Sequence, residues 1–286
     1  MIIISIHIFP HEIKNFQRIV ENLKNSIDML DETHNIHISA SLNMNDVIVD
    51  DTKYNKKEVV NMFFRSEQEI QSTTDFKIQT SVHFLGVNEE RRTIIRNSHE
   101  ADTIIFLDSD LHFDKRLLAN QINAIKLIKE INDFYIITPQ IVRLWDTTWD
   151  CIVNEKYINE SFTFHKNINP ENIISHDHGK TSVVSCNDFK WGGGWFNAIS
   201  ASLLKLVGIP DSFIGYGPDD TFIMECCKHM KSKKLNVQQY VLKNMVVVED
   251  RLSVGSPSTF HKNTPDFRTN CNKHFTDEIS IFKRKL

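Results

Sequence analysis

Two carboxylates one residue apart follow a short apolar run, and they are the most informative feature of the chain. Residues Thr103-Ile-Ile-Phe-Leu-Asp-Ser-Asp110 are typical of a buried strand that runs directly into Asp108 and Asp110. Both acids are then expected at the carboxyl end of the strand, where open α/β sheets bind their ligands. Hard carboxylate oxygens on a rigid strand end suit Mg²⁺ or Mn²⁺ held against a diphosphate. The pair therefore indicates nucleotide-sugar chemistry.

A glycine-rich motif lies in residues 190–220, about a hundred residues after the acidic pair. Its three consecutive glycines stand between Trp191 and Trp195. Glycine allows backbone to approach a ligand closely, and indole rings offer flat apolar surfaces on which a sugar can pack. We therefore expect Trp191, Gly193, Gly194 and Trp195 to bind an acceptor sugar.

The same motif ends in adjacent carboxylates, Asp219 and Asp220, directly before an apolar-faced helix. Acids at the start of a helix often serve as dipole-stabilising caps, and this alternative stays open from the residues alone. A carboxylate can also remove the proton of an attacking hydroxyl as a general base. Adjacent acids raise one another's pKa, which suits a base that works near neutral pH.

The composition is that of an ordinary soluble globular protein. The chain has 286 residues, of which 41% are hydrophobic and 24% charged, and its net charge is -4. One domain is expected at this length, and no global basic field is available to hold nucleic acid. Five scattered cysteines without CxxC spacing argue against a disulfide framework or a zinc site, so a cytoplasmic location is predicted.

No apolar run reaches the roughly 20 residues of a transmembrane helix. The segment Phe282-Lys-Arg-Lys-Leu286 leaves peripheral membrane contact open, but three basic residues contribute only about 1 kcal/mol each near anionic lipid. A solvated segment is the favoured interpretation of these five residues, and residues 266–286 are expected to form a C-terminal tail.

Apolar periodicity predicts strands that alternate with helices. Strands are expected at 2–8, 36–40, 76–82, 103–107, 134–138 and 245–248, and helices at 16–30, 57–64, 89–100, 118–128 and after 220. This alternation predicts an α/β fold with a mixed, mainly parallel central sheet flanked by helices. A long polar region after residue 143, with Trp145, Trp149, His165, His176 and His178, is typical of an acceptor-binding insert.

The order of these motifs resembles that of the GT-A fold glycosyltransferases, in particular the inverting family-two type enzymes and the β-1,4-galactosyltransferase group. Asp108-Ser-Asp110 looks like their DxD metal motif. Gly192-Gly-Gly194 followed by Gly215-Tyr-Gly-Pro-Asp-Asp220 looks like their GG…GWGGED acceptor and base motif, and Arg96-Asn97 is similar to the Arg-Asn pair of family-two sequences. The resemblance covers roughly residues 1–265.

The resemblance implies a single GT-A, Rossmann-like domain over residues 1–286. Its nucleotide-sugar half would be about 1–140, and its acceptor half about 141–265. The activity implied is metal-dependent transfer of a sugar from a nucleoside diphosphate sugar, with a UDP-sugar as the expected donor, to a hydroxyl of a glycan, glycolipid or glycoprotein, with inversion.

Individual roles also follow from the resemblance. Asp220 is implied as the catalytic base and Asp219 as a ligand of acceptor hydroxyls, although the two could exchange roles. Asp108, Asp110 and His261 are the implied metal ligands, and an imidazole ligand would favour Mn²⁺ over Mg²⁺. For His261 a surface-loop histidine is the alternative. Tyr216 joins the acceptor-binding set. The donor-binding set is Pro10, Glu12, Asn43, Arg92, Arg96 and Ser109.

Two other functions stay open. A nucleotidyltransferase also uses metal-bound aspartates on an α/β sheet, but the segment Phe9-Pro-His-Glu-Ile-Lys14 lacks the glycines that usually grip a triphosphate. A non-catalytic carbohydrate-binding protein could retain the fold, although intact acids at 108, 110, 219 and 220 argue against loss of activity.

Overall fold

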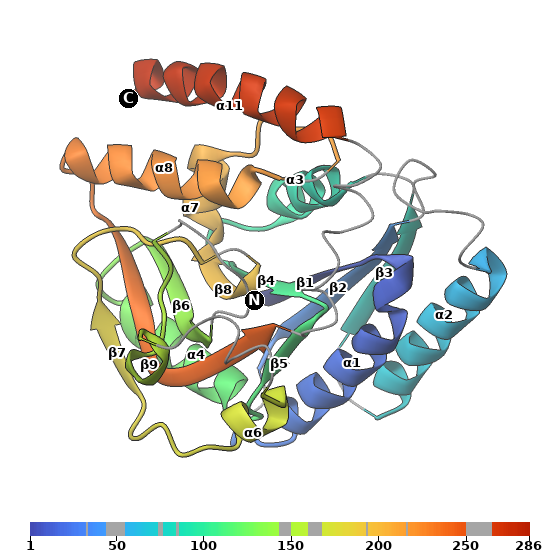
Figure 1. Cartoon of the computed structure of the whole chain (residues 1–286). Coiled ribbons are helices and arrows are strands. Elements are labelled where there is room, and N and C mark those ends of the chain that lie inside the picture. The colour runs from blue at the N-terminus through green and yellow to red at the C-terminus, as the bar shows by residue number, and fades with distance from the viewer. Residues whose placement is uncertain are drawn as a thin grey trace.

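A mixed sheet with helices on both faces forms the centre of the molecule (Figure 1). The computed structural model describes residues 1–32, 34–43, 55–73, 77–83, 86–142, 150–159, 168–192, 194–215, 217–249 and 265–286. Nine strands in these ranges form one sheet with the order β3-β2-β1-β4-β8-β6-β9-β5, and β7 pairs with β9. Among them β5, β7 and β8 run against the other six, so the mixed, mainly parallel sheet is confirmed.

The first half of the chain builds four parallel strands. These are β1 (Ile2–Ile8), β2 (Ile36–Asn43), β3 (Lys77–His83) and β4 (Thr103–Asp108). Every residue of β1 is buried, as expected for a strand covered on both faces. The connecting elements are η1 (Pro10–Glu12), α1 (Ile13–Ile27), α2 (Lys56–Thr73) and α3 (Val87–Asn97).

The second half extends the sheet and adds its remaining cover. Its strands are β5 (Leu111–Phe113), β6 (Phe134–Val142), β7 (Ser182–Ser185), β8 (Trp195–Ser200) and β9 (Val237–Glu249). Its helices are α4 (Leu117–Lys129), η2 (Glu155–Tyr157), α6 (Pro170–Ile174), α7 (Ala201–Val207), α8 (Asp219–Ser232) and α11 (Pro265–Lys285).

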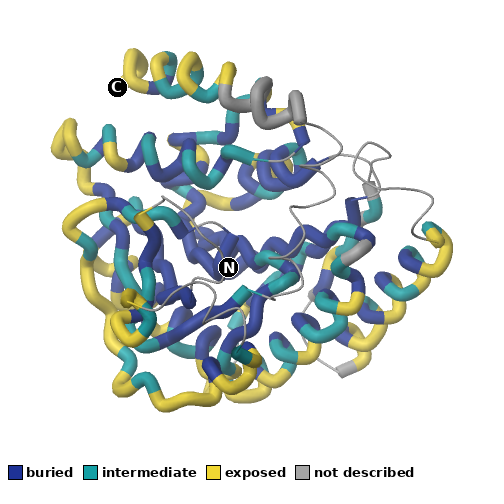
Figure 2. Tube along the Cα trace, viewed as in Figure 1, coloured by how far each residue is buried: buried dark blue, intermediate teal, exposed yellow. Residues whose placement is uncertain are grey.

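Two hydrophobic cores lie on opposite faces of the sheet (Figures 1 and 2). The alternate side chains of β1 divide between them, because Ile4 packs under α1, α2 and α4 whereas Ile3 packs under α3, α7 and α8. Figure 2 shows the buried trace running through the sheet, with exposed residues on the outer turns of the helices. None of the helices in the described part of the chain combines the length and apolar character needed to cross a bilayer.

The segment predicted as a C-terminal tail over residues 266–286 is instead largely a helix, because α11 extends from Pro265 to Lys285 and packs on α8. Phe275, Ile279 and Phe282 recur at helical spacing and form an apolar stripe against the α8 core. The rings of Phe275 and Phe222 lie 6.3 Å apart. Charged and polar residues surround these three positions in the sequence, so the amphipathic helix was not recognised from it.

Candidate active site

The carboxyl ends of β1 and β4 meet at one edge of the sheet and place the first acidic motif there. His7 of β1 pairs in register with Asp108, the last residue of β4. The Asp108 side chain is 39% exposed, so a ligand can reach it. Ser109 and Asp110 then form the turn into β5.

Glu12 joins this motif from the segment that follows β1. One carboxylate oxygen, Oε2, accepts a hydrogen bond from Ser109 Oγ at 2.8 Å and another from the Phe9 backbone N–H at 3.0 Å. Ser109 is buried. The structure therefore brings two members of the predicted donor-binding set, Glu12 and Ser109, together with the aspartate pair.

Gly194 brings the glycine-rich motif against Asp108. The Gly194 carbonyl accepts the Asp108 backbone N–H at 2.9 Å. A Cβ atom at position 194 would lie 2.0 Å from Asp108 Oδ1, so a side chain here would force the carboxylate or the backbone to move. Glycine at this position is required for β8 to pass the carboxylate, which explains one residue of the motif by direct contact.

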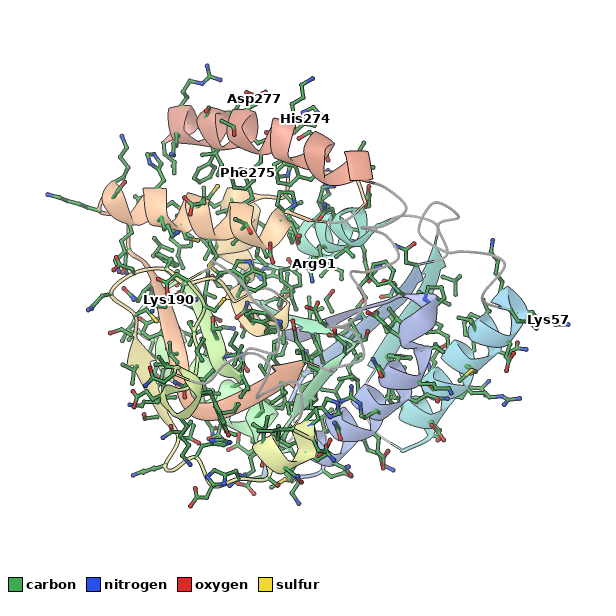
Figure 3. All side chains as sticks on the ribbon, in the orientation of Figure 1. Lys57, Arg91, Lys190, His274, Phe275 and Asp277 are labelled. Carbon is green, nitrogen blue, oxygen red and sulfur yellow. The ribbon has the colours of Figure 1, made fainter. Side chains whose placement is uncertain are left out.

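Arg91, whose position Figure 3 labels, connects the two acidic motifs. Its Nη1 donates to Asp219 Oδ2 at 2.7 Å, and its Nη2 donates to Asp108 Oδ1 at 3.4 Å. The guanidinium also lies 4.6 Å from the centre of the Phe106 ring. Burial alone would lower the pKa of Arg91, but the charges of Asp219 and Asp108 outweigh it and raise the pKa above its ordinary value. The side chain is therefore permanently charged. Residues more than a hundred positions apart thus share one buried charge.

Arg91 was not among the site residues predicted from the sequence. A signal was present: Arg91 lies four residues after Val87 and four before Ile95, both buried, so a charge stands on the apolar face of α3. A cation in that position needs a buried partner.

Asp220 and Asp219 begin α8 but have different surroundings. Asp219 is 3% exposed, and its carboxylate accepts the hydrogen bond from Arg91. Asp220 accepts hydrogen bonds at Oδ1 from the Thr221 backbone N–H at 2.6 Å and the Thr221 hydroxyl at 3.2 Å. Burial and the neighbouring Asp219 raise the pKa of Asp220 to about 6, against the lowering effect of Thr221 and Arg91.

The other acids of the cluster also hold their protons more tightly than usual. Burial, opposed by Arg91 and reinforced by Asp110, Asp220 and Asp219, raises the pKa of Asp108 to about 7. Burial and Asp110 raise the pKa of Glu12 to about 8, although the Phe9 N–H and Ser109 hydroxyl lower it. The site therefore carries a surplus of carboxyl groups over cations.

The segment before α8 is fixed to the amino end of α3. Gly86 and Gly215 pack so closely that a Cβ on Gly86 would lie 2.0 Å from the Gly215 backbone. The Glu89 carboxylate accepts the Gly215 N–H at 2.9 Å, and Asn88 Nδ2 donates to the Gly217 carbonyl at 3.2 Å. These contacts hold the approach to Asp219 in place.

Arg92 and Arg96 serve this same segment and do not face the acidic pair. Arg92 Nη1 donates to the carbonyls of Pro210 at 2.6 Å and Phe213 at 3.0 Å. Arg96 Nη2 lies 3.1 Å from the Asp211 carboxylate. The structure therefore gives no support for their predicted contact with donor phosphates, and it places Arg91 at the acids instead.

Trp195 is 2% exposed and part of the core, so it offers no face to a sugar, and this part of the acceptor-binding prediction is corrected. Its Nε1 donates to Glu249 Oε1 at 2.5 Å. The Trp191 ring meets it edge-on at 4.2 Å and is only partly buried, so Trp191 keeps some exposed surface. All six residues of β8 are buried, because the strand lies inside the sheet between β4 and β6 and is covered on both faces.

Of the remaining predicted residues, two are buried and the others lie outside the residues that the structure describes. Pro10 begins η1 and Asn43 ends β2, both buried near the ends of their strands. Gly193, Tyr216 and His261 lie outside the described residues, as do Trp145, Trp149 and His165.

The donor chemistry of the acids fits a divalent cation. Within the described ranges no three His, Cys, Asp or Glu side chains form a ready-made metal site. Mg²⁺ and its relatives commonly use only one or two protein carboxylates and complete their shell with substrate phosphates and water. Asp108 and Asp110, whose negative charges raise the pKa of the carboxyls around them, fit that requirement.

No family profile matches the sequence, and a search of curated proteins finds no match. Solved structures follow a similar chain trace. TarS 1-349 of S. aureus matches with a TM-score of 0.48 and 11% identity, over 98% of this chain and 70% of that one. GalNAc-T7 with UDP, GalNAc and Mn²⁺ matches with a TM-score of 0.48 and 12% identity, over 93% and 47%.

UDP-glucose pyrophosphorylase complexed with UDP-glucose matches with a TM-score of 0.45 and 10% identity, over 94% of this chain and 99% of that one. At these scores and identities the similarities describe the course of the backbone and carry no statement about activity.

Proposed function

We propose that the chain is a metal-dependent glycosyltransferase of the GT-A type, which moves a sugar from a nucleoside diphosphate sugar to a hydroxyl of a glycan or glycoconjugate with inversion. The observation that carries the proposal is the bridge of Arg91 between Asp108 and Asp219. This bridge puts the acids suited to a cation beside the acids suited to a base.

Asp108 and Asp110 are the proposed cation ligands. A bound Mn²⁺ or Mg²⁺ would supply charge neutralisation for the departing diphosphate. Glu12, Ser109, Pro10 and Asn43 lie near the ends of β1, β2 and β4 and form the proposed donor-binding side.

Asp220 is the proposed general base. Its pKa of about 6 leaves it mostly ionised at neutral pH while keeping it more basic than an ordinary aspartate. Asp219 is less suited to this role, because its Oδ2 is held by Arg91 and its side chain is 4% exposed. The exchange of roles that the sequence left open is therefore resolved in favour of Asp220 in our proposal.

The test has two arms, both with Mn²⁺. A panel of nucleotide sugars is assayed for release of free sugar, and nucleoside triphosphates with sugar 1-phosphates are assayed for release of pyrophosphate. Slow release of sugar with nucleoside diphosphate supports a transferase. Release of pyrophosphate from a nucleoside triphosphate and sugar phosphate identifies a nucleotidyltransferase, and binding without turnover identifies a carbohydrate-binding protein.

Variants then assign the residues. Asp110→Ala should abolish Mn²⁺-dependent binding of UDP measured by calorimetry, whereas Asp220→Asn should leave binding intact and lower turnover by about 10²–10⁴-fold. Asp277→Asn, an exposed position on α11, is the matched control and should change neither quantity. Unchanged UDP affinity in Asp110→Ala would contradict the cation assignment, and full turnover in Asp220→Asn would place the base elsewhere.

A further inference from the structure

The helices α8 and α11 run in the same direction and end on the same side of the molecule (Figure 1). Phe275 and Phe282 of α11 both lie near Phe222 of α8, at 6.3 and 6.4 Å between ring centres. Lys283 also lies close enough to Cys226, in the middle of α8, for its ammonium to counteract the burial that raises the pKa of that thiol. The last turn of α11 therefore lies over the middle of α8, and both helices point toward the same side of the molecule.

Five exposed cations lie at these two helix ends, three in the last turn of α11 and two directly after α8, and we call this surface the basic end. It consists of Lys233, Lys234, Lys283, Arg284 and Lys285. None of the five forms an ion pair with an acidic residue of the described ranges.

The neighbouring charges are already engaged. Lys228 is paired with Glu225 at 2.6 Å, and the Lys231 ammonium donates to the carbonyls of Cys186 and Asn187. Glu278 accepts a hydrogen bond from Ser212. The basic end therefore presents a nearly uncompensated positive charge on a protein whose net charge is -4.

Two exposed apolar side chains stand next to these cations in the chain. Leu235, directly after Lys234, is 39% exposed, and Leu286, directly after Lys285, is 41% exposed. Cations around exposed leucines are typical of proteins that lie on a membrane, where charge meets the lipid headgroups and the apolar groups enter the acyl boundary. A nucleic-acid backbone would use the cations but not the leucines.

We propose that the basic end binds an anionic lipid surface. In sequence only three of these cations are adjacent, and the structure adds Lys233 and Lys234 from a segment about fifty residues earlier. The 14 residues of α8 separate the surface from Asp219 by about 20 Å, so a docked protein keeps its acidic site accessible. The proposal does not depend on the proposed function.

Cosedimentation with phosphatidylcholine vesicles, with and without phosphatidylserine, tests the proposal on the full chain. Each cation near anionic lipid should increase partition by about fivefold, so the charge-reversal variant Lys234→Glu/Arg284→Glu should lower it by about 30-fold or more. The matched control is Lys57→Glu/Arg65→Glu on α2, which changes the net charge equally on the other side of the molecule (Figure 3). Thermal melting confirms that both variants are folded.

The expected result is binding only to the vesicles that contain phosphatidylserine, lost in the first variant and retained in the control. Binding should also weaken at about 1 M salt, where the Debye length is only about 3 Å. Absence of binding by the parent protein at low salt overturns the proposal, and so does equal loss in both variants, which would indicate net charge alone. Tighter binding to a duplex or single-stranded RNA than to the vesicles overturns lipid as the partner.

Discussion

Replacement of Arg91 by methionine should destabilise the protein strongly. Methionine keeps the apolar stem of the side chain but leaves Asp219, which is 4% exposed, without its partner. Removal of one partner of a buried ion pair costs about 3–5 kcal/mol, because the remaining charge is uncompensated. Loss of the contact with the Phe106 ring adds to this cost. We therefore expect a loss of about 3–5 kcal/mol in the free energy of unfolding.

Urea denaturation in the presence of EDTA measures this loss without a contribution from a bound cation. The double variant Arg91→Met/Asp219→Asn removes both charges, so it should recover about 2 kcal/mol or more relative to Arg91→Met, and a double-mutant cycle reports the coupling. Arg92→Met is the control, because Arg92 donates to the backbone carbonyls of Pro210 and Phe213 and should show no coupling to Asp219→Asn. A loss below 1 kcal/mol for Arg91→Met, or zero coupling to Asp219, would refute the bridge.

The same replacement has a second effect that packing alone does not produce. Arg91 lowers the pKa of both Asp108 and Asp220, so its loss should move the acidic limb of a pH–rate profile to higher pH. Arg91→Lys retains the charge but not the planar fork that reaches two carboxylates, and it should give a smaller shift. An unchanged acidic limb in an active Arg91→Met variant would show that Arg91 does not act on the titrating groups.

Two further perturbations follow from the site. Gly194→Ala adds a methyl group 2.0 Å from Asp108 Oδ1, so Asp108 must move and the thermal stabilisation by Mn²⁺ should fall by more than half. Gly208→Ala is the control for destabilisation alone, because its methyl would meet no atom within 4 Å but its φ of +71° strains the backbone, and it should keep the full Mn²⁺ response. A full Mn²⁺ response in Gly194→Ala would contradict the close approach. Asp220 has a pKa of about 6 in the folded protein, above its ordinary value of 3.8, because the folded state disfavours its ionised form. The stability that protonated Asp220 contributes is therefore complete below pH 3.8 and is lost as the pH rises through 6. The rise in pKa from 3.8 to about 6 corresponds to at most about 3 kcal/mol. Asp220→Asn should therefore raise the free energy of unfolding by about 1–3 kcal/mol at pH 8 and leave it unchanged near pH 4. Equal effects at both pH values would contradict the raised pKa.

Strand patterns in the first half of the sequence were sufficient to predict its part of the sheet. The alternating isoleucines of β1 and the apolar run of β4 predict extended strands from local sequence alone. Their parallel pairing follows from the helices between them. The same reasoning fails for β8, because its first residues stand in the glycine-rich motif and read as a ligand loop. It also fails for the first half of β9, where Gln238 and Gln239 interrupt the apolar pattern.

Side-chain roles within one helix could be predicted less well than the helix itself. Arg91, Arg92 and Arg96 have the same chemistry, and sequence gives only their positions on α3. Their partners come from segments more than a hundred residues away, Asp219 for Arg91 and Pro210 for Arg92. Which arginine meets the acids depends on the rotation of α3 against the sheet, and this is a tertiary property.

Within the described site, α3 is the element on which both acidic motifs depend. Glu90 accepts a hydrogen bond from the buried His7 ring at 2.7 Å beneath the end of β1, Arg91 reaches Asp108 and Asp219, and Arg92 holds the segment before α8. Consecutive residues of one helix thus set the position of the first strand, the acidic pair and the start of α8. Such an anchor is needed because burial and mutual repulsion of the carboxyls oppose their assembly, as the raised pKa values of Glu12, Asp108 and Asp220 show. Groups that destabilise a fold when ionised, and are nevertheless held together by a buried arginine, are better explained by a ligand that needs them than by a contribution to stability.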